Sequence, residues 1–291
     1  MTVDCRLLTV DYNPPMRLWI AVVCAAASPA LAAAGEVEVA VRAGQVFPFY
    51  KQSLHFDPGP FLRATFPSIV VEPVQDLRLE GRGGLALGGG LTWFPAGGFG
   101  VEARIDTADV SVTSIDALVR LRLPLPSPLP PLSSDVAIPA TADLERLRPL
   151  SLNLAARTPG RAKLRVSGGV SYLPALRFSV RSDIHASGPL AGLALAKLVV
   201  RAEAQPGGQG ESRFGFDAGA GVTWPLSGAL SLEVDARYFR FRRQTLAWTA
   251  DPGVALTPIE QQLMRELLVT LGPVTFNPEF FEATGGLTLR F

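Results

Sequence analysis

Apolar and polar residues alternate along many short stretches of this chain. In "LSLEVDARYF" (residues 230–239), every second residue is apolar or aromatic, and most of the residues between them are Ser, Glu, Asp and Arg. A repeat of two is the signal of a β-strand with one apolar and one polar face, whereas a helix repeats every three to four residues. The pattern therefore predicts an all-β protein.

Three stretches share one arrangement, in which an alternating run reaches an aromatic residue, then a proline and a short turn, and then a second alternating run. They are "GLTWFPAGGFGVEARI", "GVSYLPALRFSVR" and "GVTWPLSGALSLEVDARY". A tight break containing proline or glycine between two alternating runs is typical of a β-hairpin. The sequence therefore predicts three tight hairpins.

Extending these hairpins outward predicts eight strands, with three short turns alternating with four long connections at 45–78, 108–161, 186–212 and 240–281. The predicted strands are Glu36–Gly44, Leu79–Phe94, Phe99–Thr107, Ala162–Tyr172, Leu176–His185, Arg213–Trp224, Leu230–Phe239 and Glu282–Phe291. Short turns at one end and long loops at the other are typical of outer-membrane barrels. We therefore predict a closed antiparallel transmembrane β-barrel with short periplasmic turns and long extracellular loops.

Two further alternating runs, "DALVRLRL" and "LSLNLAAR", leave open a barrel of ten strands. In that alternative the proline-rich stretch "LPLPSPLPPL" (123–132) would lie on the periplasmic side, which disagrees with the pattern of short turns there. We therefore expect eight strands, with the two runs extending a hairpin above the membrane. Alternating prolines favour an extended, stiff outer loop at 123–132.

The polar faces of the predicted strands carry charge and glycine, which favours the polar side as the barrel interior. Glycine weakens a strand, and a narrow barrel needs it where room is short, whereas a solvated outer face does not. A basic residue turned toward lipid would cost about 2–4 kcal/mol near the bilayer midplane. We expect an interior charge network that comprises Glu102, Arg104, Asp106, Arg177, Arg181, Asp183, Asp217, Glu233, Asp235 and Arg237.

Acids and bases are similar in number on these faces, and an eight-stranded interior is only wide enough for side chains to fill it. An ion pathway would favour charges of one sign. The sequence therefore predicts a polar interior that is plugged by ion pairs.

Aromatic residues gather near both ends of the predicted strands. Trp93, Phe94, Phe99, Tyr172 and Trp224 lie near the short turns, and Phe214, Phe216, Tyr238 and Phe281 lie near the long loops. Amphipathic rings favour the two interfaces of a bilayer, whereas a soluble barrel would place its largest rings at mid-strand. We expect Trp93, Phe99, Tyr172, Trp224 and Tyr238 at the membrane interfaces.

The last strand, "GGLTLRF", must pair with the first strand, because an unpaired strand edge in lipid is prohibitively expensive. Its alternate apolar residues and final aromatic residue resemble the C-terminal β-signal that the outer-membrane assembly machinery reads. The residues that match this signal are Phe291, Leu289, Leu287 and Gly285.

Residues 35–291 resemble the eight-stranded outer-membrane barrel group that includes the OmpA transmembrane domain, OmpX and OmpW. The resemblance implies an outer-membrane location in the cell envelope of a Gram-negative bacterium, with outer-membrane lipid, lipopolysaccharide and the assembly machinery as partners. No segment follows Phe291 that corresponds to the periplasmic domain of OmpA, so we do not expect wall anchoring.

The first 34 residues predict an export signal. Arg17 precedes the apolar stretch "LWIAVVCAAA", and small residues follow in "SPALAAAGE". A basic flank, an apolar core and an A-x-A-like site form a signal peptide, so we expect cleavage after Ala32 or Ala34. Met16 is an alternative start, since the acidic residues before it are unusual in a signal.

Composition adds little chemistry. The chain has 27 basic and 26 acidic residues, so no nucleic-acid partner follows. Both cysteines, Cys5 and Cys24, lie within the predicted signal, which leaves the mature chain without thiols. His55 stands alone in a loop, and we expect neither a metal site nor a cofactor.

One short motif suggests an enzyme. His185-Ala186-Ser187 has the His-x-Ser spacing of lipid A 3-O-deacylases, in which histidine and serine suit ester hydrolysis. That substrate lies in the outer leaflet, whereas the predicted register turns Ile184 toward lipid and His185 toward the interior. The alternative is a histidine at the base of a loop, and on balance we expect no enzyme.

The last long loop contains a predicted helix at 258–271. In "LTPIEQQLMRELLVTLGP", Thr257 is a cap, Pro258 suits the first turn, and Glu260 completes a capping box. An apolar stripe follows at helical spacing. The stripe either packs on the barrel rim or forms a lid, an interfacial helix or a partner-binding element.

The function that the sequence favours is a structural or surface-interaction role for a plugged outer-membrane barrel, by analogy with the group it resembles. An alternative is a narrow conduit for small apolar molecules, with the loop helix and Phe47, Phe49 and Phe61 forming an apolar funnel. The third hypothesis is the lipid A-modifying hydrolase. The sequence does not identify an extracellular partner.

Overall fold

The structure is a computed structural model, which describes residues 35–55, 67–174, 177–182, 185–186, 198–203, 213–250 and 274–291, with single residues at 63, 258, 261 and 265. The predicted signal at 1–34 and the predicted helix at 258–271, apart from Pro258, Gln261 and Arg265, lie outside the described residues. None of the described helical positions belongs to a helix long and apolar enough to span a membrane.

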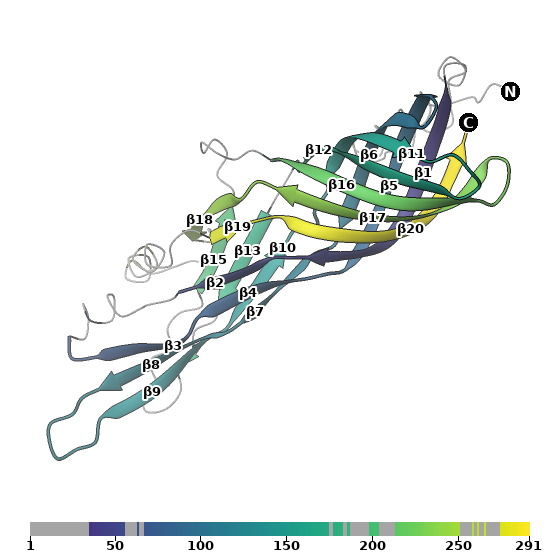
Figure 1. Cartoon of the computed structure of the whole chain (residues 1–291). Coiled ribbons are helices and arrows are strands. Elements are labelled where there is room, and N and C mark those ends of the chain that lie inside the picture. Colours follow the sequence, from purple (N-terminus) through teal and green to yellow (C-terminus); the bar gives the residue numbers. More distant parts are fainter. Residues whose placement is uncertain are drawn as a thin grey trace, which may run out of the picture.

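Eight antiparallel strands form a closed barrel (Figure 1). In their order around the barrel they are β1 (Glu36–Pro48), β5 (Leu85–Ala96), β6 (Phe99–Ala108), β11 (Leu150–Arg157), β12 (Lys163–Tyr172), β16 (Phe214–Pro225), β17 (Leu230–Phe241) and β20 (Glu279–Arg290). The predicted all-β class, the closed antiparallel barrel and the number eight are confirmed.

The last strand closes the barrel against the first. β20 pairs with β1 from Phe280 to Arg290, and with β17 on its other side. Beyond the end of β20, Val37 and Phe291 exchange two backbone hydrogen bonds, at 3.1 and 2.9 Å. The final strand is thus hydrogen-bonded along both edges, as closure in lipid requires.

The predicted membership of the barrel was wrong for one strand. The run "LSLNLAAR" forms β11, which pairs with β6 and β12, whereas Leu176–His185 lies outside the barrel and contributes β13 (Arg177–Ser182) to a second sheet. Eight strands therefore form the barrel, and the ten-stranded alternative is also wrong.

Pro174 is the physical reason for this error. Proline lacks the N–H that a ladder needs, so it interrupts a strand, but here the chain does not reverse after it. The ladder continues from Leu173, whose N–H bonds to Arg213 O at 2.9 Å. The real turn is "TPGRA" at 158–162, where Thr158 N bonds Leu164 O at 2.9 Å and Gly160 has a φ of +122°. β12 therefore runs in the direction opposite to the predicted one.

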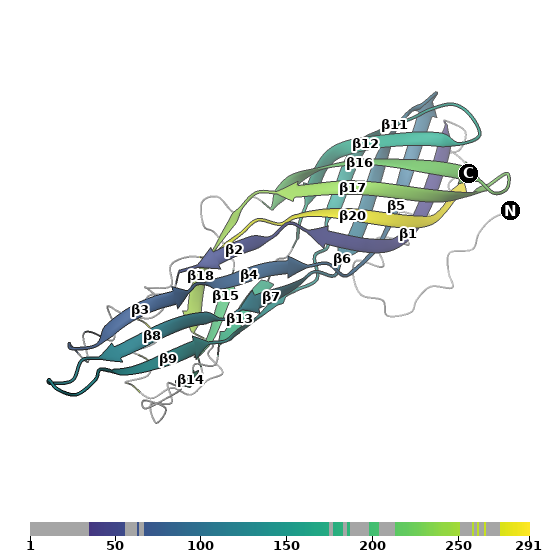
Figure 2. The ribbon, with the colours of Figure 1, turned by 60° about the horizontal axis from the view of Figure 1, so that its bottom comes forward.

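Above the barrel, the wall continues as an eight-stranded sheet (Figure 2). Its order, β2-β4-β7-β10-β13-β15-β18-β19, repeats the order of the barrel strands that these segments extend. The strands not yet given are β2 (Lys51–Leu54), β4 (Leu77–Arg82), β7 (Ser111–Ile115), β10 (Ala140–Leu144), β15 (Leu198–Glu203), β18 (Gln244–Ala250) and β19 (Val274–Phe276). We call this element the upper sheet.

Two details shape the upper sheet. The predicted strand Leu79–Phe94 is divided between β4 and β5 at Gly83 and Gly84, and a Cβ on Gly83 would lie 1.9 Å from Val46 O. The sheet does not close between β2 and β19. With its amide oriented to satisfy both partners, the Gln52 side chain bonds Thr275 O at 2.5 Å and Thr275 N at 3.3 Å, so it bridges these two edges.

A smaller sheet projects farthest from the barrel (Figures 1 and 2). It contains β14 (His185–Ala186), β9 (Leu132–Ile138), β8 (Ala117–Leu123) and β3 (Val70–Gln75), in that order. We call it the arm. The proline-rich stretch forms its tip, where residues 124–131 connect β8 to β9 and Leu129 N bonds Pro126 O at 3.1 Å. The prediction that "DALVRLRL" extends a hairpin above the membrane is confirmed for β8.

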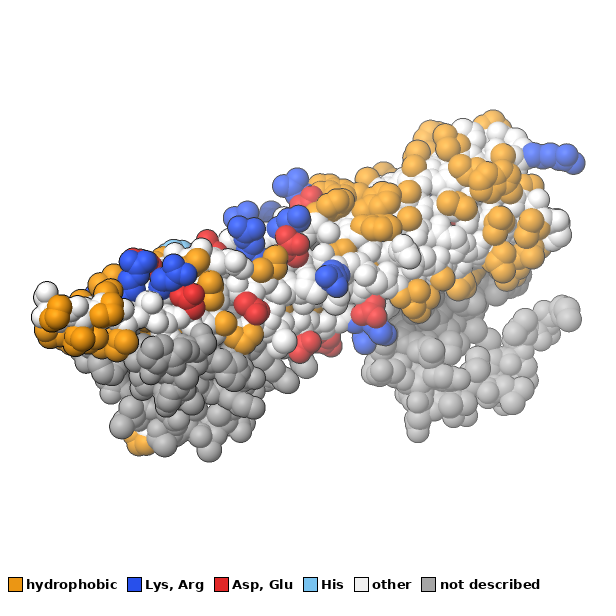
Figure 3. Space-filling model, turned by 90° about the horizontal axis from the view of Figure 1, so that it is seen from below, with side chains coloured by type: hydrophobic (Ala, Val, Ile, Leu, Met, Phe, Trp, Pro, Cys, Tyr) orange, Lys and Arg blue, Asp and Glu red, His pale blue; other side chains and the backbone are white. Residues whose placement is uncertain are grey.

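The polarity of the interior inverts between the barrel and the upper sheet, and β17 shows the change within one strand. Its inward residues are polar up to Arg237 and become aromatic at Phe239 and Phe241, while its outward residues change from Val234 to the exposed Arg240. Figure 3 shows the same boundary on the face it presents, since charged side chains begin where the hydrophobic band of the barrel ends. The sheet thus leaves the membrane near residue 238.

Candidate functional site

The outer wall of the barrel is apolar and exposed, while its inner wall is charged and buried. In β17, Val234 is 51% exposed and its neighbour Glu233 only 1%. Other exposed apolar residues on this wall include Val41, Leu87, Val101, Leu152, Leu154, Val166, Val170 and Leu287. Buried charges enclosed by an exposed apolar band are the arrangement of a transmembrane barrel and the reverse of a soluble one.

Glu102, from β6, lies at the centre of the interior and is fully buried. Its carboxylate contacts three guanidinium groups from three other strands: Arg165 at 2.8 Å, Arg237 at 3.0 Å and Arg42 at 3.5 Å. Glu233 lies beside the same cluster, 3.0 Å from Arg42, and accepts a 2.7 Å hydrogen bond from Thr288. These contacts connect strands that are far apart around the barrel.

A second cluster surrounds Arg104. This side chain donates to Asp106 at 2.5 Å and to Asp235 at 2.6 Å, and Glu282 lies 3.5 Å away. Arg237 joins the two clusters, because it also contacts Asp217 and lies 3.7 Å from Asp235. Charge-assisted contacts of this kind offset the cost of burying a guanidinium group.

A third cluster lies at the turn end. Arg157 contacts Glu36 at 2.6 Å and Glu38 at 2.7 Å, and its guanidinium carbon is 3.8 Å from the centre of the Phe94 ring. Arg290 also contacts Glu36. Phe94 was predicted among the belt aromatics, but it points inward, since it is the next residue along β5 after the outward Trp93.

Charge in the described interior is nearly balanced. The three clusters contain seven bases and eight acids, which are Arg42, Arg104, Arg157, Lys163, Arg165, Arg237 and Arg290 with Glu36, Glu38, Glu102, Asp106, Asp217, Glu233, Asp235 and Glu282. Glycine makes room for them, as a Cβ on Gly88 would lie 1.9 Å from Asp106 Oδ1. Chemically, this arrangement can hold strands together and exclude solvent.

The structure brings together seven of the ten interior charges that the sequence predicted: Glu102, Arg104, Asp106, Asp217, Glu233, Asp235 and Arg237. Arg177 and Arg181 were placed wrongly, because they belong to β13 and pair with β10 and β15 in the upper sheet. Asp183 lies outside the described residues.

Four buried members of the network were missed: Arg42, Arg165, Glu38 and Glu282. Alternation within the predicted strands could have found all four. Arg42, for example, lies at the same phase as Glu38 in the first strand, and Arg165 lies within the predicted strand Ala162–Tyr172.

The interface aromatics form two groups on the outer wall. Trp93, Phe99 and Trp224 lie toward the turns, as predicted. Tyr172 was assigned to the wrong end, because β12 runs opposite to the predicted direction. It lies beside Phe214, with ring centres 5.0 Å apart, at the loop end where Tyr238 and Phe281 also lie.

The residues of the proposed assembly signal lie on the outer face of β20 and, for Phe291, directly after its end. Leu287, Leu289 and Phe291 expose about half of their surface, and Gly285 shares their face. Recognition by the assembly machinery remains a prediction.

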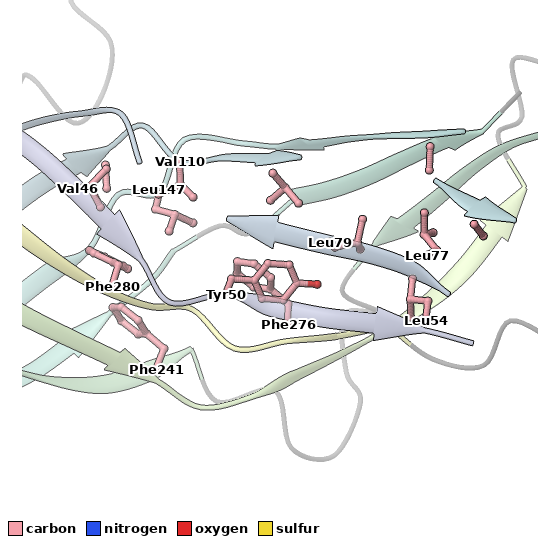
Figure 4. Close-up of a cluster of buried hydrophobic side chains, with 14 of the residues drawn as sticks. Val46, Tyr50, Leu54, Leu77, Leu79, Val110, Leu147, Phe241, Phe276 and Phe280 are labelled. Carbon is pink, nitrogen blue, oxygen red and sulfur yellow. The ribbon is translucent and has the colours of Figure 1, made fainter. Parts of the chain in front are cut away.

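Above the ionic clusters, the interior is filled with apolar side chains (Figure 4). Phe239, Phe241 and Phe280 stack, with the closest ring centres 4.8 Å apart, and Tyr50 packs on Phe276 at the same distance. Burial raises the pKa of the Tyr50 phenol. The interior of the described chain thus has an ionic layer and an apolar layer in series.

The histidine of the His-x-Ser motif does not lie in a barrel strand. His185 lies in β14, opposite Ala137 of β9, within the arm. The prediction that it lines the interior was therefore wrong, since the strand it was assigned to ends before it. Ser187 lies outside the described residues.

Comparison with known proteins gives likeness of fold alone. No protein-family model matches the chain, and no curated protein matches it. Among solved structures, it is similar to the outer membrane protein OprG of Pseudomonas aeruginosa, with 11% identity, a TM-score of 0.40, and coverage of 89% of this chain and 96% of that one. It is also similar to the attachment invasion locus protein Ail of Yersinia pestis, with 9% identity, a TM-score of 0.34 and coverage of 88% and 99%.

The outer membrane protease OmpT of Escherichia coli is a third similar structure, at 9% identity, a TM-score of 0.39 and coverage of 88% and 97%. Because these identities and TM-scores are low, the assignment to the outer membrane is made from the structure of this chain itself. Its closed antiparallel barrel of eight strands, apolar outer band and charged interior are those of an outer-membrane barrel protein, and they place the chain in the outer membrane.

Proposed function

We propose that this protein is a sealed outer-membrane barrel that holds a rigid β-structure above the membrane for interaction at the cell surface. The observation that carries the proposal is the continuity of the wall: the upper sheet extends the barrel strands in the same order, and the arm projects beyond it. We infer that the loop side, and with it the arm, faces outward.

The two layers of the interior support the sealed state. Ion pairs connect β1, β6, β12 and β17 across the lower layer, and stacked aromatic rings fill the upper one. An ion that entered would have to break buried pairs, which costs several kcal/mol each.

The tip of the arm supports surface interaction. From Leu123 to Ser134 the chain has no charged residue, and the tip exposes Leu129 and Leu132. The paired strands below the tip also carry an exposed ion pair, in which Arg120 donates to Asp135 at 2.8 Å and 3.2 Å. These hydrogen bonds from Arg120 lower the pKa of the Asp135 carboxyl. Exposed apolar residues on a hairpin of two paired strands suit contact with another surface.

The sealed state is tested in planar bilayers with the full chain. We expect no steady conductance above the bare bilayer, with a porin as the positive control. Uptake of a small apolar dye into vesicles tests the conduit alternative. Steady conductance, or dye uptake faster than in vesicles without protein, would refute the seal.

Surface interaction is tested by replacing residues 124–131 with Asn-Gly, which closes a two-residue hairpin between Leu123 and Leu132, already paired in β8 and β9. Cells that display this variant should adhere to surfaces and to other cells less than wild type. The matched control keeps the loop length and changes Ser127 to Ala. Equal adhesion of all three proteins would contradict the role of the tip.

A further inference from the structure

Three exposed arginines, Arg240, Arg242 and Arg243, lie together at the loop end of β17 and line one surface hollow. They come from "RYFRFRR" (237–243), in which Phe239 and Phe241 point inward and are buried. Strand alternation therefore turns Arg240 outward, on the same face that carries Leu232 and Val234 lower down, and Arg242 and Arg243 follow directly after the strand. Arg240 is thus a charged side chain on a face that is otherwise apolar.

Their level on the wall is fixed by the aromatic belt. Tyr238 is paired with Phe281 of β20, and its ring centre lies 6.3 Å from that of Phe216. Phe281 lies 6.3 Å from Phe47 on the next strand. Such rings mark the interface of the bilayer. Two residues advance about 7 Å along a strand, so Arg240 lies just above that belt and Arg242 follows two residues farther on.

The arginines line a surface hollow of about 480 Å³, together with Phe214 and Phe216 of β16 and Asn277. Among the described residues, no carboxylate lies within 4 Å of the guanidinium of Arg240, Arg242 or Arg243. The one acid nearby in register is Glu279, opposite Arg240, and it already accepts hydrogen bonds from Tyr238 and, at 3.1 Å, from Asn277. The hollow therefore has a positive excess.

We infer that this hollow binds the phosphate of a phosphorylated glycolipid in the outer leaflet. Guanidinium groups match phosphate oxygens in pairs, and clustered bases at the surface of a membrane attract anionic headgroups. Phe214 and Phe216 are half-exposed on the neighbouring strand beside the arginines, with Phe216 paired with Arg240, and they would contact the first carbons of the acyl chains. A free phosphate would use the arginines but not these two rings.

This inference deepens the proposed function by naming a lipid that the outer wall holds, and it rests on the outward loop side in that proposal. It does not depend on the sealed interior, because the hollow lies outside the barrel. If the barrel conducts ions but still binds the lipid, the sealed interior is refuted and the lipid site is not.

The test measures binding by native mass spectrometry of the refolded full chain in detergent. The probes are lipid A with two phosphates, the same lipid without phosphates, and inorganic phosphate as a competitor. The variant changes Arg240, Arg242 and Arg243 to Gln. The control variant removes the same charge from the upper sheet and arm, at Arg78, Arg120 and Arg122.

We expect the variant to bind phosphorylated lipid A at least about tenfold more weakly than wild type, because several charge-assisted hydrogen bonds are lost. The control should bind as wild type does, and the lipid without phosphates should bind wild type no better than it binds the variant. Inorganic phosphate should not displace the lipid at equal concentration.

Equal binding of lipid A by wild type and the Gln variant would overturn the inference. So would equal binding of the two lipids, or displacement by equimolar inorganic phosphate, which would indicate a site for a free anion. Heat-modifiable migration in gels checks that each variant is folded. If the Gln variant does not fold, a variant with Lys at the three positions retains the charge but lacks the paired donors, so it should bind phosphorylated lipid A more weakly than wild type, and equal binding would overturn the inference.

Discussion

Neutralising Glu102 tests whether the ionic layer holds the barrel together. Glu102→Gln keeps the shape of the side chain and removes only its charge, so no cavity is created. The residue is fully buried and contacts Arg165, Arg237 and Arg42 between 2.8 and 3.5 Å. The three guanidinium groups would lose the one anion that they share.

The magnitude follows from what those arginines retain. Removing one partner of a buried ion pair costs about 3–5 kcal/mol. Here Arg165 still lies 3.6 Å from Glu233, and Arg237 still contacts Asp217. We therefore expect a loss at the lower end, about 3 kcal/mol, or about two orders of magnitude in the unfolding equilibrium constant.

The assay is reversible urea unfolding of the refolded chain in lipid vesicles, followed by tryptophan fluorescence, to which Trp93 and Trp224 on the outer wall contribute. The denaturant midpoint should fall while its slope stays constant, since the surface exposed on unfolding is unchanged. The control is Asp135→Asn, which removes one partner of the exposed Arg120 ion pair in the arm. Exposed pairs contribute little, so this midpoint should not move measurably.

A second variant tests whether the uncompensated charge of Arg165 causes the loss. Arg165→Met in the Glu102→Gln background removes a cation left with less compensation, so it should recover part of the lost stability. If Glu102→Gln unfolds within about 0.5 kcal/mol of wild type, the ionic layer does not stabilise the barrel in the way that the contacts indicate.

Three further predictions concern the outer wall, the packing of the interior and the arm. Val234→Arg should destabilise the barrel by about 2–4 kcal/mol in urea unfolding, because the residue faces lipid. Val74→Arg in the arm should not destabilise it, because Val74 faces water although it is similarly exposed, at 48% against 51% for Val234. Equal effects of the two substitutions would contradict the lipid-facing assignment. Gly88→Ala places a Cβ 1.9 Å from Asp106 Oδ1 and should lower the free energy of unfolding by about 1–3 kcal/mol. Gly228→Ala, whose Cβ would have nothing within 4 Å, should leave the free energy of unfolding unchanged. If both substitutions are neutral, the interior has spare room at Gly88. Because Arg120 lowers the pKa of Asp135, the stabilising contribution of that pair is complete above the ordinary aspartate pKa and is lost as the pH falls through the lowered value. Carboxyl NMR should place the Asp135 midpoint below that of a model peptide, and an ordinary midpoint would show that the pair does not form in solution.

Alternation along the chain was sufficient to predict the barrel. It predicted the all-β class, seven of the eight barrel strands, the apolar outer wall and seven of the buried charges, because a period of two assigns each side chain to one face before any partner is known. Lipid makes this assignment strict, since a charge on the outer wall is costly. The repeated aromatic residues at strand ends likewise marked the interfaces.

Which strands belong to the barrel was decided by the tertiary structure. The run "LSLNLAAR" and the run after Tyr172 alternate equally well, and the proline in "YLPA" resembled a turn. Only strand pairing shows that Pro174 interrupts a continuing strand, and this one difference reversed β12, moved Tyr172 to the other interface and removed Arg177 and Arg181 from the interior.

The sequence by itself determined which face of each segment is apolar and which is charged. It did not determine at which residue the apolar face stops facing outward and begins to face the interior. In β17 the inward side changes from Arg237 to Phe239 with no break in alternation, because the period of two is the same in lipid and in water. Only the paired strands show that the wall continues past the membrane, where water replaces lipid outside and the apolar residues turn to the core.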